Sequence, residues 1–119
     1  MDKMQVLNEF WNSFEWPAYD QNTVPDNAML PYITYEAATD DFNNELYLTA
    51  SLWDRSTSWE RVTLKEKEIS TDISKGGRMI LYSDGAMWIK MRSPWAQRMS
   101  DEDDGIRRIL LSVTIEFIE

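Results

Sequence analysis

The chain contains neither cysteine nor histidine among its 119 residues. Without cysteine it can form no disulfide framework, no thiolate nucleophile and no cysteine-based zinc site. Without histidine it lacks the commonest general base, the commonest transition-metal ligand and the side chain that titrates near neutral pH. The composition therefore favours a protein that acts by binding, and we predict no catalytic residue, no cofactor and no metal site.

Long apolar runs are also missing. No stretch of about 18 apolar residues occurs, so we expect no membrane-spanning helix. Asp2 and Lys3 precede an amphipathic segment, which differs from the basic and then apolar plan of a signal peptide. A length of 119 residues suits one domain. We also expect an intracellular site of assembly.

Charge is plentiful but unevenly distributed. The formal net charge is −9, which disfavours nonspecific binding to nucleic acid. Residues 1–60 hold 11 acidic and 2 basic residues, whereas residues 61–119 hold 10 of each. Such a division suits a chain that presents different surfaces to different neighbours.

The clearest local pattern lies in residues 46–77. Leucine and alanine alternate with larger or polar residues over 46–53, the period of a strand with one buried face. Thr57 and Glu60 have the spacing of a capping box, which predicts the start of a helix. Gly76 and Gly77 suit the end of that helix, because glycine accepts a left-handed conformation.

The rest of the chain predicts strands around this central helix. An aromatic stripe at helical spacing indicates an amphipathic helix over residues 2–15, followed by a proline-rich loop over 16–31. The remaining elements are strands at 32–37, 78–82, 86–91 and 109–117, a turn at 39–44, a hairpin turn at Ser83-Asp84-Gly85 and a long connection at 92–105.

The predicted architecture is an α+β domain with a mainly antiparallel sheet of about five strands, in the order α-β-β-α-β-β-β. Residues 1–31 supply the N-terminal helix and loop, and residues 32–119 supply the sheet with its central helix. The strand at 109–117 alternates most cleanly, so we expect it in a central or well-paired position.

The acidic run before Gly105 invites a calcium interpretation. It consists of Asp101, Glu102, Asp103 and Asp104. With Gly105 at the sixth position of a calcium loop, the first and twelfth ligand positions hold Ser100 and Leu111, so the pattern fails at its two most important ligands. A solvated turn is the better interpretation. A third interpretation is a patch of like charge that faces passing nucleic acid and does not bind it.

Tryptophan and arginine are candidates for interface anchors. Six tryptophans are present, and packing in the core accounts for each one singly. The set with its nearby arginines has the composition favoured in protein interfaces, since both side chains combine buried area with directed hydrogen bonds. The candidates are Trp53, Arg55, Trp59, Arg98, Arg107 and Arg108.

Four stretches also carry a resemblance to a known class of proteins. They are PYITYEAATDDF, LTASLWDRSTSWE, ISKGGRMILYSDGAMWI and SPWAQRMSDEDDGIRRILLSVTIEF, and together they span roughly residues 30–118. They resemble small minor structural proteins of long-tailed bacteriophages and prophages, of the tail-completion or tail-terminator type. The resemblance rests on short phrases, because the family has no catalytic motif to carry over.

The resemblance implies a structural protein of the virion, at the head–tail junction, assembled in the bacterial cytoplasm. Its expected partners are further copies of itself in a ring, commonly a hexamer, the tail tube protein and a head–tail connector protein. DNA would pass through the lumen without specific binding. The interface candidates above would lie between subunits, and residues 101–104 would face the lumen or the rim.

Two other functions are compatible with the residues. A head-completion or stopper protein would occupy the other side of the same junction. A small monomeric adaptor that binds a cellular protein belongs to a different class. The mass of the protein in solution, with electron microscopy of any ring, separates these alternatives.

Overall fold

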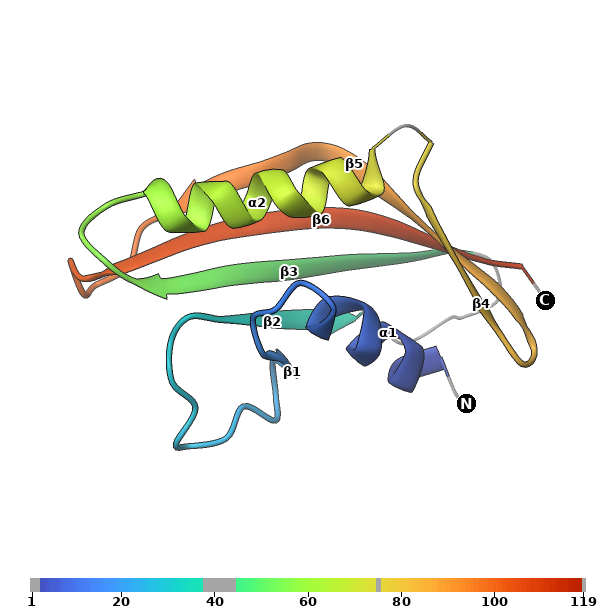
Figure 1. The fold of residues 1–119 in the computed structure, drawn as a ribbon, viewed down its shortest axis with the longest axis horizontal. Coiled ribbons are helices and arrows are strands. Elements are labelled where there is room, and N and C mark those ends of the chain that lie inside the picture. The colour runs from blue at the N-terminus through green and yellow to red at the C-terminus, as the bar shows by residue number, and fades with distance from the viewer. Residues whose placement is uncertain (1–2, 38–44, 75, 119) are drawn as a thin grey trace.

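A six-stranded sheet forms the body of the computed structural model, which describes residues 3–37, 45–74 and 76–118. The strands lie in the order β1-β2-β3-β6-β5-β4 (Figure 1). Their bounds are β1 Ala18–Asp20, β2 Tyr32–Ala37, β3 Glu45–Arg55, β4 Arg78–Tyr82, β5 Gly85–Met99 and β6 Ile106–Ile118. The two helices are α1 Lys3–Asn12 and α2 Glu60–Ile73. The expected α+β class is confirmed, as is the predominance of antiparallel pairing, and the strand count is six.

The core lies on one face of the two central strands. For example, Leu48 of β3 and Val113 of β6 lie directly opposite each other in the ladder and are both buried. The predicted alternation over 46–53 is confirmed, because Leu46, Leu48, Ala50 and Leu52 are all nearly inaccessible. The expected central position of the last strand is also confirmed, since β6 pairs with β3 on one side and β5 on the other.

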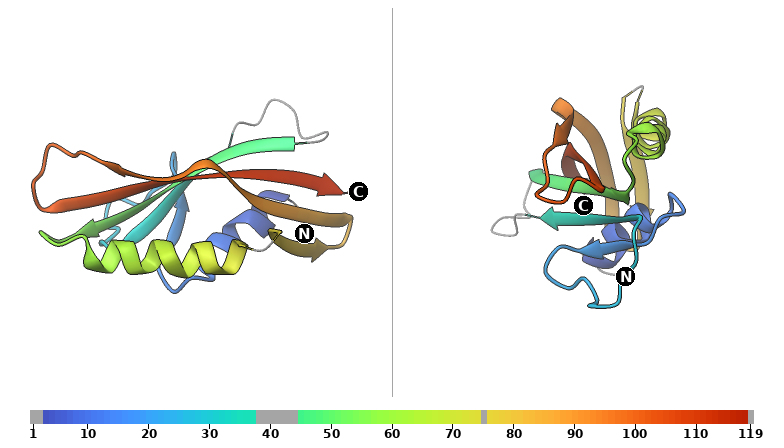
Figure 2. Two further views of the ribbon diagram at one scale, coloured as in Figure 1. Left: turned by 90° about the horizontal axis from the view of Figure 1, so that it is seen from above. Right: turned by 90° about the vertical axis from the view of Figure 1, so that its left-hand side faces the viewer.

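Both helices cover the same face of the sheet (Figure 2). Val62, Ile69 and Ile73 of α2 are buried, as the sequence predicts. Helix α1 buries a second apolar stripe, composed of Val6, Leu7, Phe10 and Trp11. No helix within the described residues covers the opposite face, which we call the open face.

The start of α2 differs from the predicted capping box. Trp59 occupies the N-cap position and makes no side-chain capping hydrogen bond. Serine hydroxyls act earlier instead: Ser56 Oγ accepts from the Ser58 amide at 2.9 Å, and Ser58 Oγ accepts from the Glu60 amide at 3.1 Å. These side-chain turns shape the connection from β3 to α2 and replace the expected role of Thr57.

The predicted glycine stop after α2 is confirmed. Gly76 and Gly77 both have φ near +95°, the region that favours glycine. A Cβ on Gly77 would lie 2.5 Å from Trp88 Nε1 and 2.6 Å from the Ile89 carbonyl oxygen. Position 77, between α2 and β4, therefore has room for the hydrogen atom of glycine and not for a side chain.

The N-terminal region contains a strand that the sequence pattern missed. Helix α1 ends at Asn12, earlier than predicted, and β1 lies inside the expected loop, where it pairs in parallel with β2. The Asn12 side chain accepts from the Ala18 amide at 2.9 Å and donates to the Ala18 carbonyl at 3.2 Å. This contact ties the end of α1 to β1.

The predicted connection at 92–105 is wrong for most of its length. Strand β5 continues to Met99, and Ala96–Met99 pair with Arg108–Leu111 of β6. The ladder is irregular only between Met91 and Ala96, the segment that contains Pro94. Proline breaks a ladder by removing a donor, but here it lies within the irregular segment and the strand resumes beyond it.

The two predicted turns have different outcomes. Tyr82 pairs with Gly85 across the turn of Ser83 and Asp84, which confirms the hairpin between β4 and β5. The predicted turn at 39–44 lies outside the described residues.

Candidate functional site

The end of the sheet that leads into α2 holds a buried carboxylate. Asp54, near the end of β3, has no exposed surface and faces the helices. Arg61 in the first turn of α2 donates from Nε to Asp54 Oδ2 at 3.0 Å and from Nη2 to the other carboxylate oxygen. These hydrogen bonds raise the pKa of the Arg61 guanidinium. The pair therefore holds the start of α2 against the end of β3.

Trp59 lies beside this pair with two guanidinium groups over its ring. The Arg98 guanidinium carbon is 4.6 Å from the ring centroid, and that of Arg107 is 5.4 Å away. Arg98 comes from β5 and Arg107 from β6, so three separate segments meet here. Cations attract the negative face of an indole ring, so the stack holds the α2 start against the β5–β6 hairpin.

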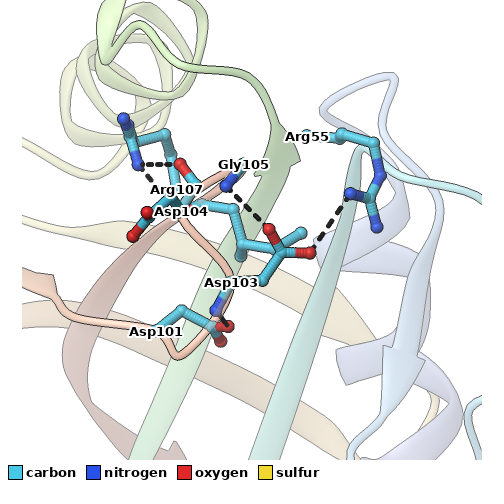
Figure 3. Close-up of polar contacts among 7 residues, drawn as sticks. Arg55, Asp101, Asp103, Asp104, Gly105 and Arg107 are labelled. Carbon is cyan, nitrogen blue, oxygen red and sulfur yellow. Dashed lines mark hydrogen bonds and ion pairs between the residues drawn. The ribbon is translucent and has the colours of Figure 1, made fainter.

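The acidic loop between β5 and β6 is organised by its own carboxylates (Figure 3). Asp101 Oδ1 accepts from the Asp103 amide at 2.9 Å, and Asp103 Oδ1 accepts from the Gly105 amide at 2.8 Å. The other oxygen of Asp103 is 3.4 Å from Arg55 Nη1 of β3. The amide of Gly105, and next the guanidinium of Arg55, lower the pKa of the Asp103 carboxyl.

Arg107 joins this loop to the β3–α2 connection. Its Nη1 donates to the carbonyl oxygen of Asp104 at 2.9 Å (Figure 3). Its Nη2 donates to the carbonyl oxygen of Thr57 at 2.9 Å. Ser56 adds a backbone hydrogen bond to the Gly105 carbonyl at 2.8 Å. The loop is therefore docked onto the chain that starts α2.

A hollow of about 250 Å³ opens between these groups. Its lining includes most of the residues singled out from sequence: Trp59, Arg98, Asp101, Asp103, Asp104 and Arg107. Glu102 lies exposed in the same loop. The hollow combines one indole ring, two guanidinium groups and several carboxylates, so it could receive a polar or aromatic side chain from a partner.

The other two predicted anchors lie on the open face. The Arg108 guanidinium is 4.6 Å from the Trp53 ring, and its Nε donates to Ser51 Oγ at 3.0 Å. Trp53 Nε1 donates to Thr34 Oγ1 at 2.9 Å. The structure therefore divides the predicted anchors into a loop-end group and an open-face group.

Two further stacks on the open face were missed by the sequence. The Arg92 guanidinium lies 4.7 Å from the Tyr47 ring, and Lys90 Nζ lies 4.4 Å from the Trp88 ring. Lys90 also approaches Glu116 at 3.5 Å. Alternation within residues 86–92 puts Trp88, Lys90 and Arg92 on one side, and that signal becomes useful once β5 is placed beside β6.

The described ranges contain no group of three or more acidic residues placed to hold a metal ion. No helix within residues 3–37, 45–74 or 76–118 has the length and apolar character needed to cross a membrane.

Comparison with known proteins gives a similarity of fold. No protein-family model matches the sequence, and no curated protein matches it. The fold is similar to that of a chain in a solved structure described as "Virion of native gene transfer agent (GTA) particle", with a TM-score of 0.62. The alignment covers 99% of this chain and 87% of that chain at 13% sequence identity. At this identity the similarity establishes a shared fold.

Proposed function

We propose that the chain is a structural protein of a virion, forming a ring at the head-proximal end of a phage tail tube. The observation that carries the proposal is the fold shared, over almost the whole chain, with a component of a gene transfer agent virion. The resemblance of residues 30–118 to tail-terminator proteins supports the same conclusion independently.

The geometry suits a ring subunit. A ring needs two different, complementary surfaces on each subunit and two further surfaces for the neighbours above and below. The chain offers a helix-covered face (Figure 2), an open face with cation–aromatic stacks, and a loop end with a polar hollow. The tail tube protein and a connector protein are the proposed axial partners, and the subunit works by binding alone.

Particles assembled without this chain test the role. A ring that ends tube growth predicts tubes of uncontrolled length that do not join heads, visible by electron microscopy. Heads that leak DNA beside tails of normal length would support a stopper protein instead. Normal particles would contradict both roles and favour the cellular adaptor.

The acidic loop is proposed to face the lumen or the rim, where carboxylates would repel passing DNA. Glu102 and Asp104 are the best residues to change, because neither side chain makes a hydrogen bond or an ion pair within the described residues. Glu102→Lys with Asp104→Lys should allow rings to form and should slow DNA ejection. Glu60→Lys with Asp84→Lys makes the same change of charge at two exposed positions outside the loop and is the matched control. Ejection at the normal rate from the loop variant would show that the loop does not line the channel.

The absence of catalysis is part of the proposal. Hydrolase and transferase assays with divalent metals should show no turnover by the purified chain. Metal-dependent turnover that is lost in an Asp103→Asn, Asp104→Asn variant would contradict it.

A further inference from the structure

Charge is separated between two surfaces of the folded chain. Between residues 4 and 54 the sequence has no lysine or arginine. Glu9 of α1, Glu15 after it, Asp20 of β1 and Asp26 in the next loop belong to the segment that contains the edge strand β1, and three of these four are exposed. We call these four residues the acidic margin.

The open face carries the opposite charge in its β5–β6 half. Arg92 and Arg108 form no ion pair with any carboxylate of the described residues, although the chain as a whole has an excess of acids. Each guanidinium instead lies against an aromatic ring, Tyr47 or Trp53. A guanidinium held this way keeps donors at its edge and loses little side-chain freedom on binding a carboxylate. We call these four residues the arginine face.

Apolar groups accompany the charges on both surfaces. Met29, in the same loop as Asp26, is 82% exposed. On the open face, Leu81 is 79% exposed and Tyr47 is 56% exposed, and Ile118 lies across Ala86 from Leu81 in the ladder. Exposed ion pairs contribute little by themselves, so burial of such apolar area would supply most of the affinity and charge would supply orientation.

We propose that the arginine face of one copy binds the acidic margin of a second copy. The inference rests on the proposed function, because a closed ring requires a head-to-tail contact between two unlike surfaces. The two surfaces lie on different parts of one chain, so the same contact can repeat from copy to copy. A nucleic acid is a poorer occupant, because its regularly spaced phosphates would meet Glu36, Glu45 and Glu116 of the open face as well as the arginines. The few separate carboxylates of the acidic margin can lie opposite the arginines alone.

Trapping by disulfides tests the contact directly, because the natural chain has no cysteine to interfere. Gln21→Cys places one thiol beside the acidic margin, and Gln97→Cys places one on the open face; both side chains are exposed. Circular dichroism verifies the fold of each variant. An equal mixture, with one variant tagged, is oxidised at low salt, and the dimers are separated by mass. Thr71→Cys on the exposed side of α2 replaces each partner in turn as a control.

Mixed dimers should exceed the homodimers of either variant by about tenfold or more, because even a weak contact raises the local thiol concentration. The excess should fall toward the random proportion in 1 M salt, where charges are screened beyond about 3 Å. Random proportions at low salt would overturn the inference. They would leave the proposed function open, because that function is judged on the particles.

Charge reversal tests the residues. Arg92→Glu should abolish the excess of mixed dimers, and Lys67→Glu, the same charge change on α2, should not. When the Gln21→Cys protein also carries Glu9→Lys and Asp26→Lys, the excess of mixed dimers with the Arg92→Glu, Gln97→Cys protein should return. Arg92→Gln, which preserves most of the packing on Tyr47, should weaken trapping without altering the fold. The proposal would be overturned if the Arg92→Glu variant formed mixed dimers as well as the unchanged chain does. It would also be overturned if the chain bound single-stranded DNA at physiological salt and formed no mixed dimers.

Discussion

Arg107 and Thr57, separated by 50 positions in the chain, are joined by a hydrogen bond of 2.9 Å from the guanidinium to the backbone carbonyl. The same guanidinium donates to the Asp104 carbonyl and lies over Trp59. A residue that composition marks as an interface anchor thus also holds the β3–α2 connection to the acidic loop. Its substitution will affect the fold as well as any partner.

Arg107→Ala should lower the free energy of unfolding by about 2 kcal/mol, because two hydrogen bonds to backbone carbonyl oxygens and the stacking contact on Trp59 are lost. Arg98→Ala loses only the stack on Trp59 and should cost about 1 kcal/mol or less. Urea denaturation of the two variants measures the difference. Equal effects would show that the carbonyl contacts of Arg107 do not stabilise the loop.

Asp103 should make the stability of the chain depend on pH. Its pKa in the folded state is lowered, so its contribution is fully present above the unfolded pKa of about 3.9 and is lost as pH falls through the lower folded value. The difference in urea midpoint between wild type and Asp103→Asn should be constant near neutral pH and shrink in acid. Asp84→Asn, in the exposed β4–β5 turn, is the control and should show no such trend. A difference that grows in acid would contradict the assignment.

Phe117 and Ile118 form a matched pair at the end of β6. Phe117 is 7% exposed and faces the core, whereas Ile118 is 45% exposed and lies on the open face. Phe117→Ala should cost about 3 kcal/mol or more through lost burial and the cavity left behind. Ile118→Ala should cost less than about 1 kcal/mol, as expected for a largely exposed position. An unchanged denaturation midpoint for Phe117→Ala would show that the ring does not belong to the core.

Gly77 and Gly76 provide a second matched pair, since both have φ near +95°. Gly76→Ala should cost about 1 kcal/mol for the backbone conformation alone, because nothing lies within 4 Å of its new Cβ. Gly77→Ala should cost about 2 kcal/mol more, because its Cβ would collide with the Ile89 carbonyl. Thermal unfolding of the two variants measures the gap, and equal melting temperatures would mean that β4 can move aside.

The alternation of apolar residues and the presence of turn-forming residues predicted most of the fold, because both depend only on neighbouring residues in the sequence. Alternation identified β3 and β6, and the Asp-Gly sequence located the β4–β5 hairpin. Strand β1 was missed because three residues carry no period; it exists through parallel pairing with β2 and the Asn12 side chain. The second half of β5 was missed because Pro94 indicates a break, and only the partner strand shows that pairing resumes.

The site was predicted by composition and not by geometry. Counting tryptophans and arginines selected Trp59 and Arg107, but which ring meets which cation depends on strand register. Arg92 was not among the candidates, since composition alone does not show that it stacks on Tyr47. Sequence reasoning therefore named the side chains that matter and could not divide them between the loop end and the open face.

The position of β6 has a consequence for how the chain reaches its native state. β6 follows both of its neighbours in sequence and lies between them, with residues 45–55 on one side and 86–99 on the other. Until residue 118 has been synthesised, the β2–β3 and β4–β5 hairpins cannot share a core, and their apolar sides stay open. Pairing at such sequence separation slows folding and prolongs exposure to aggregation. Productive subunits should therefore depend on rapid capture of β6, and a nascent chain stalled before Ile106 should be a preferred client of chaperones.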